Sequence, residues 1–219
     1  KKIIELINNK FLKPIVVIDV GAHHGETIKL FIKKLRLKKI YSFEASPKNF
    51  KILSKNMSKI NDNKVEFYNF GIGDKISKDY LNQTLESSSS TINELNTNSK
   101  YFKKKLKILN INDNEKFYHR VLISIVTLDF FIEKNNIDNI DLLKIDTEGY
   151  EFNVLKGLSK QNQKIKLVYF EHHYDDMIVK NYKFGDIHKL LKSFGFVMIK
   201  KSKMLFRKSF EYVYENKKI

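Results

Sequence analysis

The chain contains no cysteine. Disulfide bonds, cysteine-ligated zinc, iron–sulfur clusters and a cysteine nucleophile are therefore excluded within this chain. The absence of cysteine is also typical of a reducing compartment, so we expect a cytoplasmic protein.

Long apolar runs are missing too. None approaches the roughly 18 residues of a membrane span, and Lys10 and Lys13 interrupt the stretch where a secretory signal would continue. We expect no transmembrane segment.

Arginine is scarce, although the formal net charge is +16 at pH 7. The three arginines are Arg36, Arg120 and Arg207, whereas the lysines are spread over nearly every segment. Surfaces that read phosphate groups use arginine heavily, because its planar guanidinium binds a phosphate with two parallel hydrogen bonds. The charge is compatible with nucleic acid or an anionic membrane, but the scarcity of arginine predicts no specific nucleic-acid partner.

The 219 residues suit one well-buried domain and are few for two. Apolar runs typical of buried parallel strands alternate with segments at helical spacing, which predicts an α/β fold with a mostly parallel sheet. The predicted strands are 15–20, 39–45, 65–74, 121–128, 141–145, 166–171, 196–200 and 209–215. The predicted helices are 2–11, 26–37, one that starts at Pro47 after the cap Ser46, 127–135, 151–157 and 185–195. Residues 75–125 break the alternation and predict an insertion, either a solvated connection or a flap over a site.

The first predicted strand ends in "DVGAHHG". Gly21 lets the backbone approach a ligand, and Gly25 opens the next helix, whose N-terminal amides attract a carboxylate or phosphate. The spacing G-x-x-x-G matches neither the dinucleotide fingerprint nor the phosphate loop. This argues against a nicotinamide-dependent oxidoreductase and against a phosphate-cradling site.

Two acids flank this turn along the chain. Asp19 precedes the glycines, near where the ammonium group of a ligand would lie. Glu44 ends the second predicted strand, where an acid accepts hydrogen bonds from the two hydroxyls of a ribose. An acid, a glycine turn and a ribose acid without a phosphate loop suit S-adenosylmethionine, which joins adenosine to an amino acid.

Several motifs together resemble the FkbM family of S-adenosylmethionine-dependent methyltransferases, over about residues 16–175. They are "VIDVGAHHGE", "FEASPKNF", "GIGD", the serine run, "VTLDFF", "LLKIDTEGYEFNVLKGL" and "YFEHH". The resemblance implies the class I Rossmann-like fold, a mostly parallel seven-stranded sheet with helices on both faces. It implies one methyltransferase domain over 1–219 with the insertion at about 75–125. His23 and His24 are uncommon in this turn of the family, and we expect them to be turn residues rather than ligands.

The resemblance also implies a function. The family mostly methylates hydroxyls, so we expect an O-methyltransferase with a small-molecule or glycan acceptor. The alternatives are an RNA ribose methyltransferase and a catalytically silent binding module. The sequence leaves the oligomeric state open. The cofactor-binding residues implied are Asp19, Gly21, Ala22, Gly25, Thr27, Glu44, Ser46, Gly73 and Asp74.

Acidic residues follow the apolar run of "LLKIDTEGYEF". Because unpaired buried charges are costly, we expect the acids to line the mouth of an active site. In this fold the fourth and fifth core strands are expected beside the first, so the acids and histidines at their ends open into one cleft. The catalytic candidates are Asp146, Glu148, Glu171, His172 and His173. Glu151 is expected to be a charge at a helix N-terminus.

The role of each candidate stays open at this stage. A general base that removes the acceptor proton is Asp146, Glu171 or one of the two histidines. Alternatively Mg²⁺ is held by Asp146 with Glu148, Glu171 or His172, and it acidifies the acceptor hydroxyl. Methylation of base amino groups is disfavoured, because Pro14 and Pro47 are isolated and the Asn/Asp-Pro-Pro-aromatic loop is absent.

Overall fold

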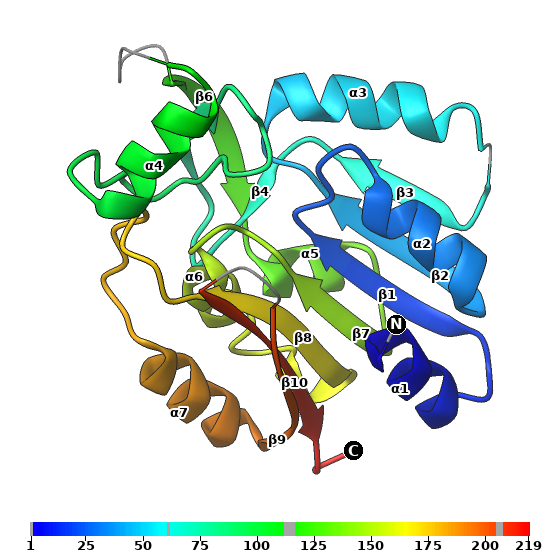
Figure 1. Ribbon diagram of the computed structural model, residues 1–219. Coiled ribbons are helices and arrows are strands. Elements are labelled where there is room, and N and C mark those ends of the chain that lie inside the picture. Colours follow the sequence, from blue (N-terminus) through cyan, green and yellow to red (C-terminus); the bar gives the residue numbers. More distant parts are fainter. Residues whose placement is uncertain (1, 61, 112–116, 205–207) are drawn as a thin grey trace.

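A seven-stranded sheet with the order β3-β2-β1-β7-β8-β10-β9 forms the centre of the computed structural model (Figure 1). The structure describes residues 2–60, 62–111, 117–204 and 208–219. The strands of this sheet are β1 (Ile15–Val20), β2 (Leu37–Phe43), β3 (Val65–Tyr68), β7 (Ile140–Ile145), β8 (Ile165–His173), β9 (Phe196–Lys203) and β10 (Ser209–Asn216). The helices are α1 (Lys2–Lys10), α2 (Glu26–Lys34), α3 (Pro47–Met57), α4 (Lys100–Ile108), α5 (Leu128–Lys134), α6 (Glu151–Lys156), the short η2 (Asn162–Lys164) and α7 (Phe184–Phe194).

The sheet is mostly parallel. Pairings β3–β2, β2–β1, β1–β7 and β7–β8 are parallel, and β10 is antiparallel to both β8 and β9. The chain leaves β1 toward β2 on one side, whereas β7 pairs with β1 on the other, so the strand order reverses at β1. The expectation for the fifth core strand was wrong in one respect: β8 pairs with β7 and β10, not with β1.

Helices cover both faces of the sheet because side chains alternate along each strand. Val17 packs with α1, α2 and α3 on one face. Its neighbour Ile18 packs with α5, α6 and α7 on the other. Every residue of β7 is buried, as expected for a parallel strand covered on both sides. The predicted class I fold is confirmed, with its mostly parallel seven-stranded sheet and two helical layers.

Most predicted ends of elements hold for the expected reasons. Ser46 caps α3, its hydroxyl accepting from the backbone of Asn49 with Pro47 at the first helical position. Gly195 ends α7 in the left-handed region, with φ of 99°. The helix predicted over 26–37 ends earlier, because Leu35 is already extended and leads into β2.

The third predicted strand, 65–74, is divided between two sheets. Its first part is β3 of the main sheet, and its last part is β4 (Gly71–Ile72). A second, three-stranded sheet has the order β4-β6-β5, with β5 at Ser77–Thr84 and β6 at Tyr118–Val126. β6 corresponds to the strand predicted over 121–128, whereas β5 and α4 had no sequence prediction.

Residues 75–125 therefore hold β5, the serine run, α4 and most of β6, and 112–116 lie outside the described residues. Ser99 caps α4, whose Phe102 and Leu106 are buried against Met177 and Ile178 from the segment after β8. This contact holds the second sheet and α4 over the carboxyl ends of the main strands (Figure 1). Among the described residues, none of the helices has both the length and the apolar character needed to span a membrane.

Candidate active site

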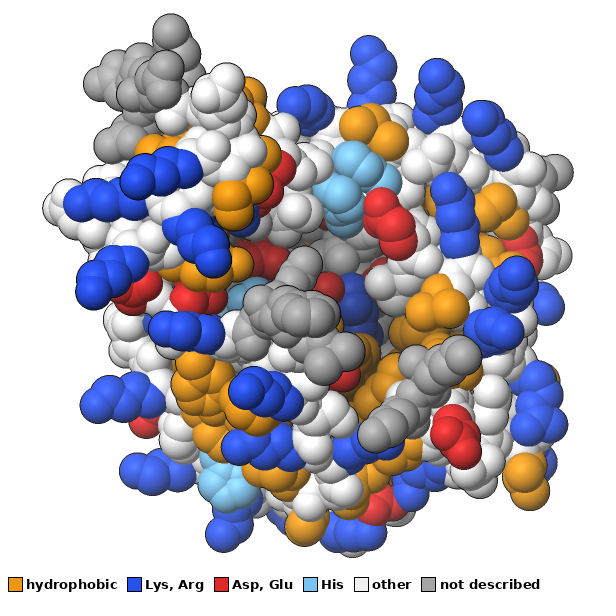
Figure 2. All heavy atoms as spheres, viewed as in Figure 1, with side chains coloured by type: hydrophobic (Ala, Val, Ile, Leu, Met, Phe, Trp, Pro, Cys, Tyr) orange, Lys and Arg blue, Asp and Glu red, His pale blue; other side chains and the backbone are white. Residues whose placement is uncertain are grey.

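A cleft of about 260 Å³ lies at the carboxyl ends of β1, β2, β7 and β8, where the strand order reverses. Its walls come from the turn after β1, the residues after β2, the serine run and the turn between β7 and α6. Figure 2 shows acidic and histidine side chains around a hollow on this face, with basic side chains along the outer margin. Open α/β sheets bind their ligands at this edge.

The turn after β1 packs backbone against backbone. The N–H groups of Gly21 and Ala22 both donate to the carbonyl of Phe43, each over 2.9 Å. Gly21 has a φ of 89°, and a Cβ there would lie only 1.9 Å from the carbonyl oxygen of Asp146. Only glycine permits this approach, so the turns after β1 and β7 are fixed relative to each other.

Glu44 is buried beside this turn and is held by backbone donors. One carboxylate oxygen accepts from the N–H of His23 over 2.8 Å, and the other accepts from the N–H of Ser46 over 2.9 Å. Burial raises the pKa of Glu44 to about 7, against the effect of these hydrogen bonds. The Asn49 side chain also hydrogen-bonds this carboxyl, which lines the cleft.

Lys144 brings a buried ammonium to the floor of the cleft. In the parallel pairing of β1 and β7 it lies opposite Asp19, and its Nζ is 3.0 Å from that carboxylate. Nζ also lies 3.5 Å from Asp146 and donates to the carbonyl of Gly21 over 3.2 Å. Burial acts to lower the pKa of Lys144, but Asp19 and Asp146 raise it above its ordinary value. Asp19 itself is fully buried, so Lys144 rather than Asp19 faces the cleft.

Glu148, Glu171 and His173 form a compact ionisable group beside Asp146. The Nε2 atom of His173 lies 3.6 Å from Glu148 and 3.5 Å from Glu171, and its Nδ1 lies 3.6 Å from Asp175. Burial raises the pKa of Glu148 to about 8; His173 opposes this shift and Asp146 adds to it. Burial acts to lower the pKa of His173, but the Asp175 hydrogen bond and the neighbouring carboxylates raise it to about 9.

The backbone of Glu148 is held in an unusual conformation, with a φ of 49° for a residue other than glycine. The hydroxyl of Thr91 donates to its carbonyl over 2.7 Å, and the amide of Asn93 donates to the next carbonyl, that of Gly149, over 2.5 Å. Glu151 is fully buried and accepts from the N–H of Gly149 and the hydroxyl of Tyr182. The segment after the serine run therefore fixes where the Glu148 carboxyl points.

A family model described as the methyltransferase FkbM domain matches residues 19–198. The chain belongs to the FkbM methyltransferase family. The resemblance inferred from the motifs is thereby confirmed.

Methyltransferase 1 of Beauveria bassiana (strain ARSEF 2860) is 25% identical over 155 residues, covering 67% of this chain and 59% of that protein. The crystal structure of Methyltransferase FkbM from Methylobacillus flagellatus KT aligns with a TM-score of 0.59 at 14% identity, covering 92% of this chain and 43% of that one. The FkbM chain described here thus spans less than two thirds of either protein.

More distant structures share the fold. M. capricolum TrmK, in complex with S-adenosyl-homocysteine, has a TM-score of 0.51 at 12% identity, covering 98% of this chain and 67% of that one. Magnesium protoporphyrin IX methyltransferase (ChlM) from Synechocystis PCC 6803, with bound SAM, has a TM-score of 0.55 at 10% identity, covering 98% and 76%. These likenesses place the FkbM chain in the class I methyltransferase fold.

A second cavity, of about 240 Å³, adjoins the cleft of this FkbM chain. Glu148 and Ser88 line both spaces. The other lining residues come from the serine run and the residue before it, from α4, from the end of β8 and the segment after it, and from the residue before β10. They are Glu86, Ser89, Tyr101, Lys105, His173, Asp175, Met177, Ile178 and Lys208. Most of these side chains carry hydrogen-bonding groups, so the cavity suits a polar ligand.

The cleft gathers many of the residues predicted from the FkbM motifs. Those that line it are Gly21, Ala22, Thr27, Glu44, Asp146, Glu148 and Glu171. Five predicted cofactor residues do not, and Asp19, which is fully buried beside Lys144, is one of them. Gly25 is the N-cap of α2. The Ser46 hydroxyl accepts from the N–H of Asn49 at the start of α3 and donates to the side-chain oxygen of Gln83. Gly73 packs against Tyr150, while Asp74 pairs with Lys156 over 2.6 Å.

His172 and His173 point to opposite faces of β8, because side chains alternate along a strand. His173 joins the acids of the cleft. His172 packs among the rings of Tyr174, Tyr182 and Phe184, and burial lowers its pKa to about 4. The predicted metal set of Asp146, Glu171 and His172 is therefore not brought together.

The sequence prediction missed Lys144 and the pair Thr91 and Asn93. A signal existed for Lys144: it is a lone cation in the apolar run "LLKI", as Asp19 is a lone anion in "IVVIDV". Buried charges are normally paired, so these two apolar runs predict an ion pair between neighbouring strands. No comparable signal marks Thr91 and Asn93, because polar residues are common in loops.

Proposed function

We propose that the cleft binds S-adenosylmethionine and that the chain transfers its methyl group. The charge of the lining supports this. Among the described residues, five acidic side chains line the cleft, against the single ammonium of Lys144: Glu26, Glu44, Asp146, Glu148 and Glu171. Such a lining favours a ligand that carries a sulfonium cation and an ammonium group.

The chemical character of the lining suits the adenosine part of the cofactor. The carboxyl of Glu44 is held by the N–H groups of His23 and Ser46, lines the cleft and suits the ribose hydroxyls as an acceptor. Beside it the wall is apolar and suits a purine ring. Its members are Phe43, Phe70, Ile72, Leu81, Ile92 and Tyr150. The Lys144 ammonium pairs with Asp19 and Asp146 under this ligand.

The acceptor is proposed to be a hydroxyl of a glycan or another small molecule, bound in the second cavity. The observation that carries this proposal is Glu148, whose carboxyl lines both spaces. A hydroxyl must lose its proton during methyl transfer, and a base works best when its pKa is near the working pH. Glu148, with a pKa raised to about 8, meets this condition. His173, with a pKa of about 9, is cationic at neutral pH and serves to position the Glu148 carboxyl.

The chemistry is an in-line displacement. The acceptor oxygen forms a bond to the methyl carbon while the carbon–sulfur bond breaks, and sulfur leaves as the neutral thioether of S-adenosylhomocysteine. The hydroxyl proton passes to the carboxylate of Glu148. Asp146, whose side chain is 39% exposed, orients the hydroxyl. Alignment of this kind contributes about 7–11 kcal/mol, and a positioned base about 10²–10⁴-fold.

We further propose that one methyltransferase domain carries residues 75–125 as an insertion that selects the acceptor. This is supported by Ser88, Ser89, Tyr101 and Lys105, which line the second cavity. The proposed mechanism does not use Mg²⁺, because among the described residues the candidates Asp146, Glu148, Glu171 and His172 do not bring three ligand atoms within 4.8 Å of one another. Methyl transfer is therefore expected to continue in the presence of a chelator.

The test uses the purified chain with S-adenosylmethionine carrying a tritiated methyl group. Acceptors are offered in three arms: oligosaccharides and glycosides, small phenols and polyols, and structured RNA. We expect a methyl ether in one of the first two arms. Glu148→Gln should lose about 10²-fold or more in turnover, while Glu133→Gln, an exposed acid of α5, should not. Methylation of RNA alone, transfer only to nitrogen, or equal rates for both variants would each contradict the proposal.

A further inference from the structure

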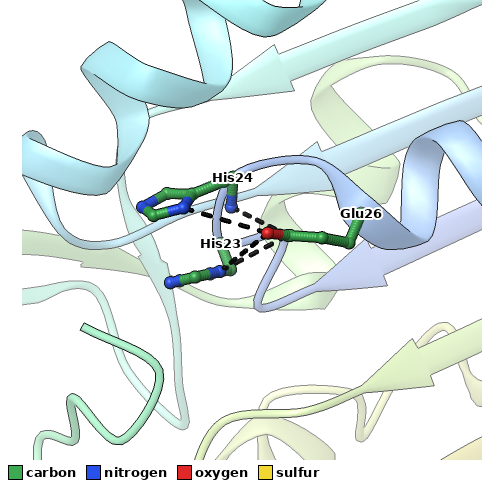
Figure 3. Close-up of side chains that lie close together, drawn as sticks. All are labelled: His23, His24 and Glu26. Atoms are coloured by element: carbon green, nitrogen blue, oxygen red, sulfur yellow. Dashed lines mark hydrogen bonds and ion pairs between the residues drawn. The ribbon is translucent and has the colours of Figure 1, made fainter. Parts of the chain in front are cut away.

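The turn between β1 and α2 carries a cluster of three side chains of metal-ligating type, none of which has a role in the proposed proton transfer. His23, His24 and Glu26 each offer one ligand atom, and these atoms all lie within 4.8 Å of one another. The Nδ1 atom of His23 is 3.3 Å from Glu26 Oε1, and that of His24 is 3.8 Å from the same oxygen. Figure 3 shows the two rings one above the other on the same side of the turn, with dashed lines from both histidines to the Glu26 carboxylate.

The local backbone produces this arrangement. Consecutive side chains on extended backbone point apart, but His23 has a φ of 50°, in the left-handed region. The two rings consequently stack, with centroids 3.7 Å apart and planes 22° from parallel. The N–H of His23 donates to Glu44, and Asn56 donates to the carbonyl of His24 over 2.8 Å. The turn is therefore held in place before any ligand arrives.

We propose that His23, His24 and Glu26 bind a divalent transition-metal ion of the Zn²⁺ type. Zinc bonds of about 2.0–2.2 Å to nitrogen and oxygen place tetrahedral ligand atoms roughly 3.3–3.6 Å apart. The separations of 3.3 and 3.8 Å from Glu26 Oε1 are close to this range, and a turn of the stacked His24 ring brings both Nδ1 lone pairs toward one ion. Two imidazoles with one carboxylate leave a fourth position for water. Imidazole ligands suit Zn²⁺, Ni²⁺ and Cu²⁺, whereas Mg²⁺ and Ca²⁺ prefer oxygen.

Ser87 supplies the outer contact that metal-binding histidines normally have. Its Oγ lies 2.8 Å from Nε2 of His23. In the tautomer that donates from Nε2 to Ser87, Nδ1 carries a lone pair that faces the Glu26 carboxylate. A metal ion between these two groups removes their repulsion, as in other sites where the second ring nitrogen is hydrogen-bonded. Because His23 and Glu26 also line the cofactor cleft, the ion sits at its rim.

Binding is tested with Zn²⁺ alone and the untagged chain, by calorimetric titration. We expect one Zn²⁺ per chain, and Co²⁺ should give a tetrahedral visible absorption at the same stoichiometry. His24→Gln and Glu26→Gln should each weaken binding by about tenfold or more. The matched control, His119→Gln, alters an exposed histidine of β6 and should leave the affinity unchanged.

Folding of each variant is checked by its melting temperature without metal, which should stay near that of the parent chain. Zn²⁺ should raise the melting temperature of the parent and of His119→Gln only, because a ligand stabilises the state that binds it. No one-to-one binding, an equal loss in His119→Gln, or displacement of Zn²⁺ by equimolar Mg²⁺ would overturn the assignment.

Discussion

Replacement of Lys144 by methionine should destabilise the fold strongly. The variant keeps most of the side-chain volume but leaves Asp19, which is fully buried, without its partner at 3.0 Å. Removing one member of a buried ion pair typically costs about 3–5 kcal/mol. For a chain of this size, each kcal/mol lowers the melting temperature by roughly 2–4 °C. The expected fall is therefore about 6–20 °C.

The assay is urea unfolding followed by circular dichroism at pH 7, with two comparison variants. Lys166→Met removes a cation 2.8 Å from Asp141, but Lys166 is 41% exposed, so about 1 kcal/mol or less should be lost. Asp19→Leu combined with Lys144→Met removes both charges, and much of the stability should return.

The pH dependence supplies a further check on Lys144→Met. Burial raises the pKa of Asp19 above that of the unfolded chain, where aspartate titrates near about 4. An acid whose pKa is higher in the folded than in the unfolded chain contributes stability below the unfolded pKa, and this contribution is lost as the pH rises through the folded pKa. Lys144 acts to lower the pKa of Asp19, so its removal raises that pKa further. The variant should therefore lose less stability at pH 4, where Asp19 can be protonated, than at pH 7. A loss below about 1 kcal/mol at pH 7, equal to that of Lys166→Met, would refute the reasoning.

Four further predictions concern the cleft and the charge. Glu44→Gln should weaken S-adenosylmethionine binding by about tenfold or more in a calorimetric titration, because the amide offers one acceptor oxygen instead of two; unchanged affinity would remove the ribose assignment. Asp146→Asn should lower turnover roughly a hundredfold with little change in melting temperature, whereas unfolding of the variant would make this acid structural. In the pH profile of kcat/KM, activity should fall as the pH drops below about 8, where Glu148 becomes protonated, and Glu148→Gln should abolish that limb. Gel shifts at about 150 mM salt should show at most micromolar, sequence-blind binding to RNA and DNA, and a nanomolar sequence-dependent complex would contradict this.

The candidate site was predictable where a motif lies next to a strand end. Gly21, Glu44 and Asp146 follow apolar runs, and parallel strands bring their carboxyl ends to one edge of the sheet. The prediction failed for residues whose surroundings come from elsewhere. Asp74 pairs with Lys156, and the orientation of His172 depends on where β8 ends, which the sequence placed two residues too early.

The sequence by itself determined the α/β class, the family and the strand ends that form the cleft, because apolar periodicity and the glycine turns are local properties of the chain. Only the tertiary structure decided what surrounds each charge. Strand register placed Lys144 between Asp19 and Asp146, and the folding of residues 75–125 brought Thr91 and Asn93 onto the Glu148 turn. These contacts join residues far apart in the chain, and the protonation of a buried carboxyl depends on its neighbours in space.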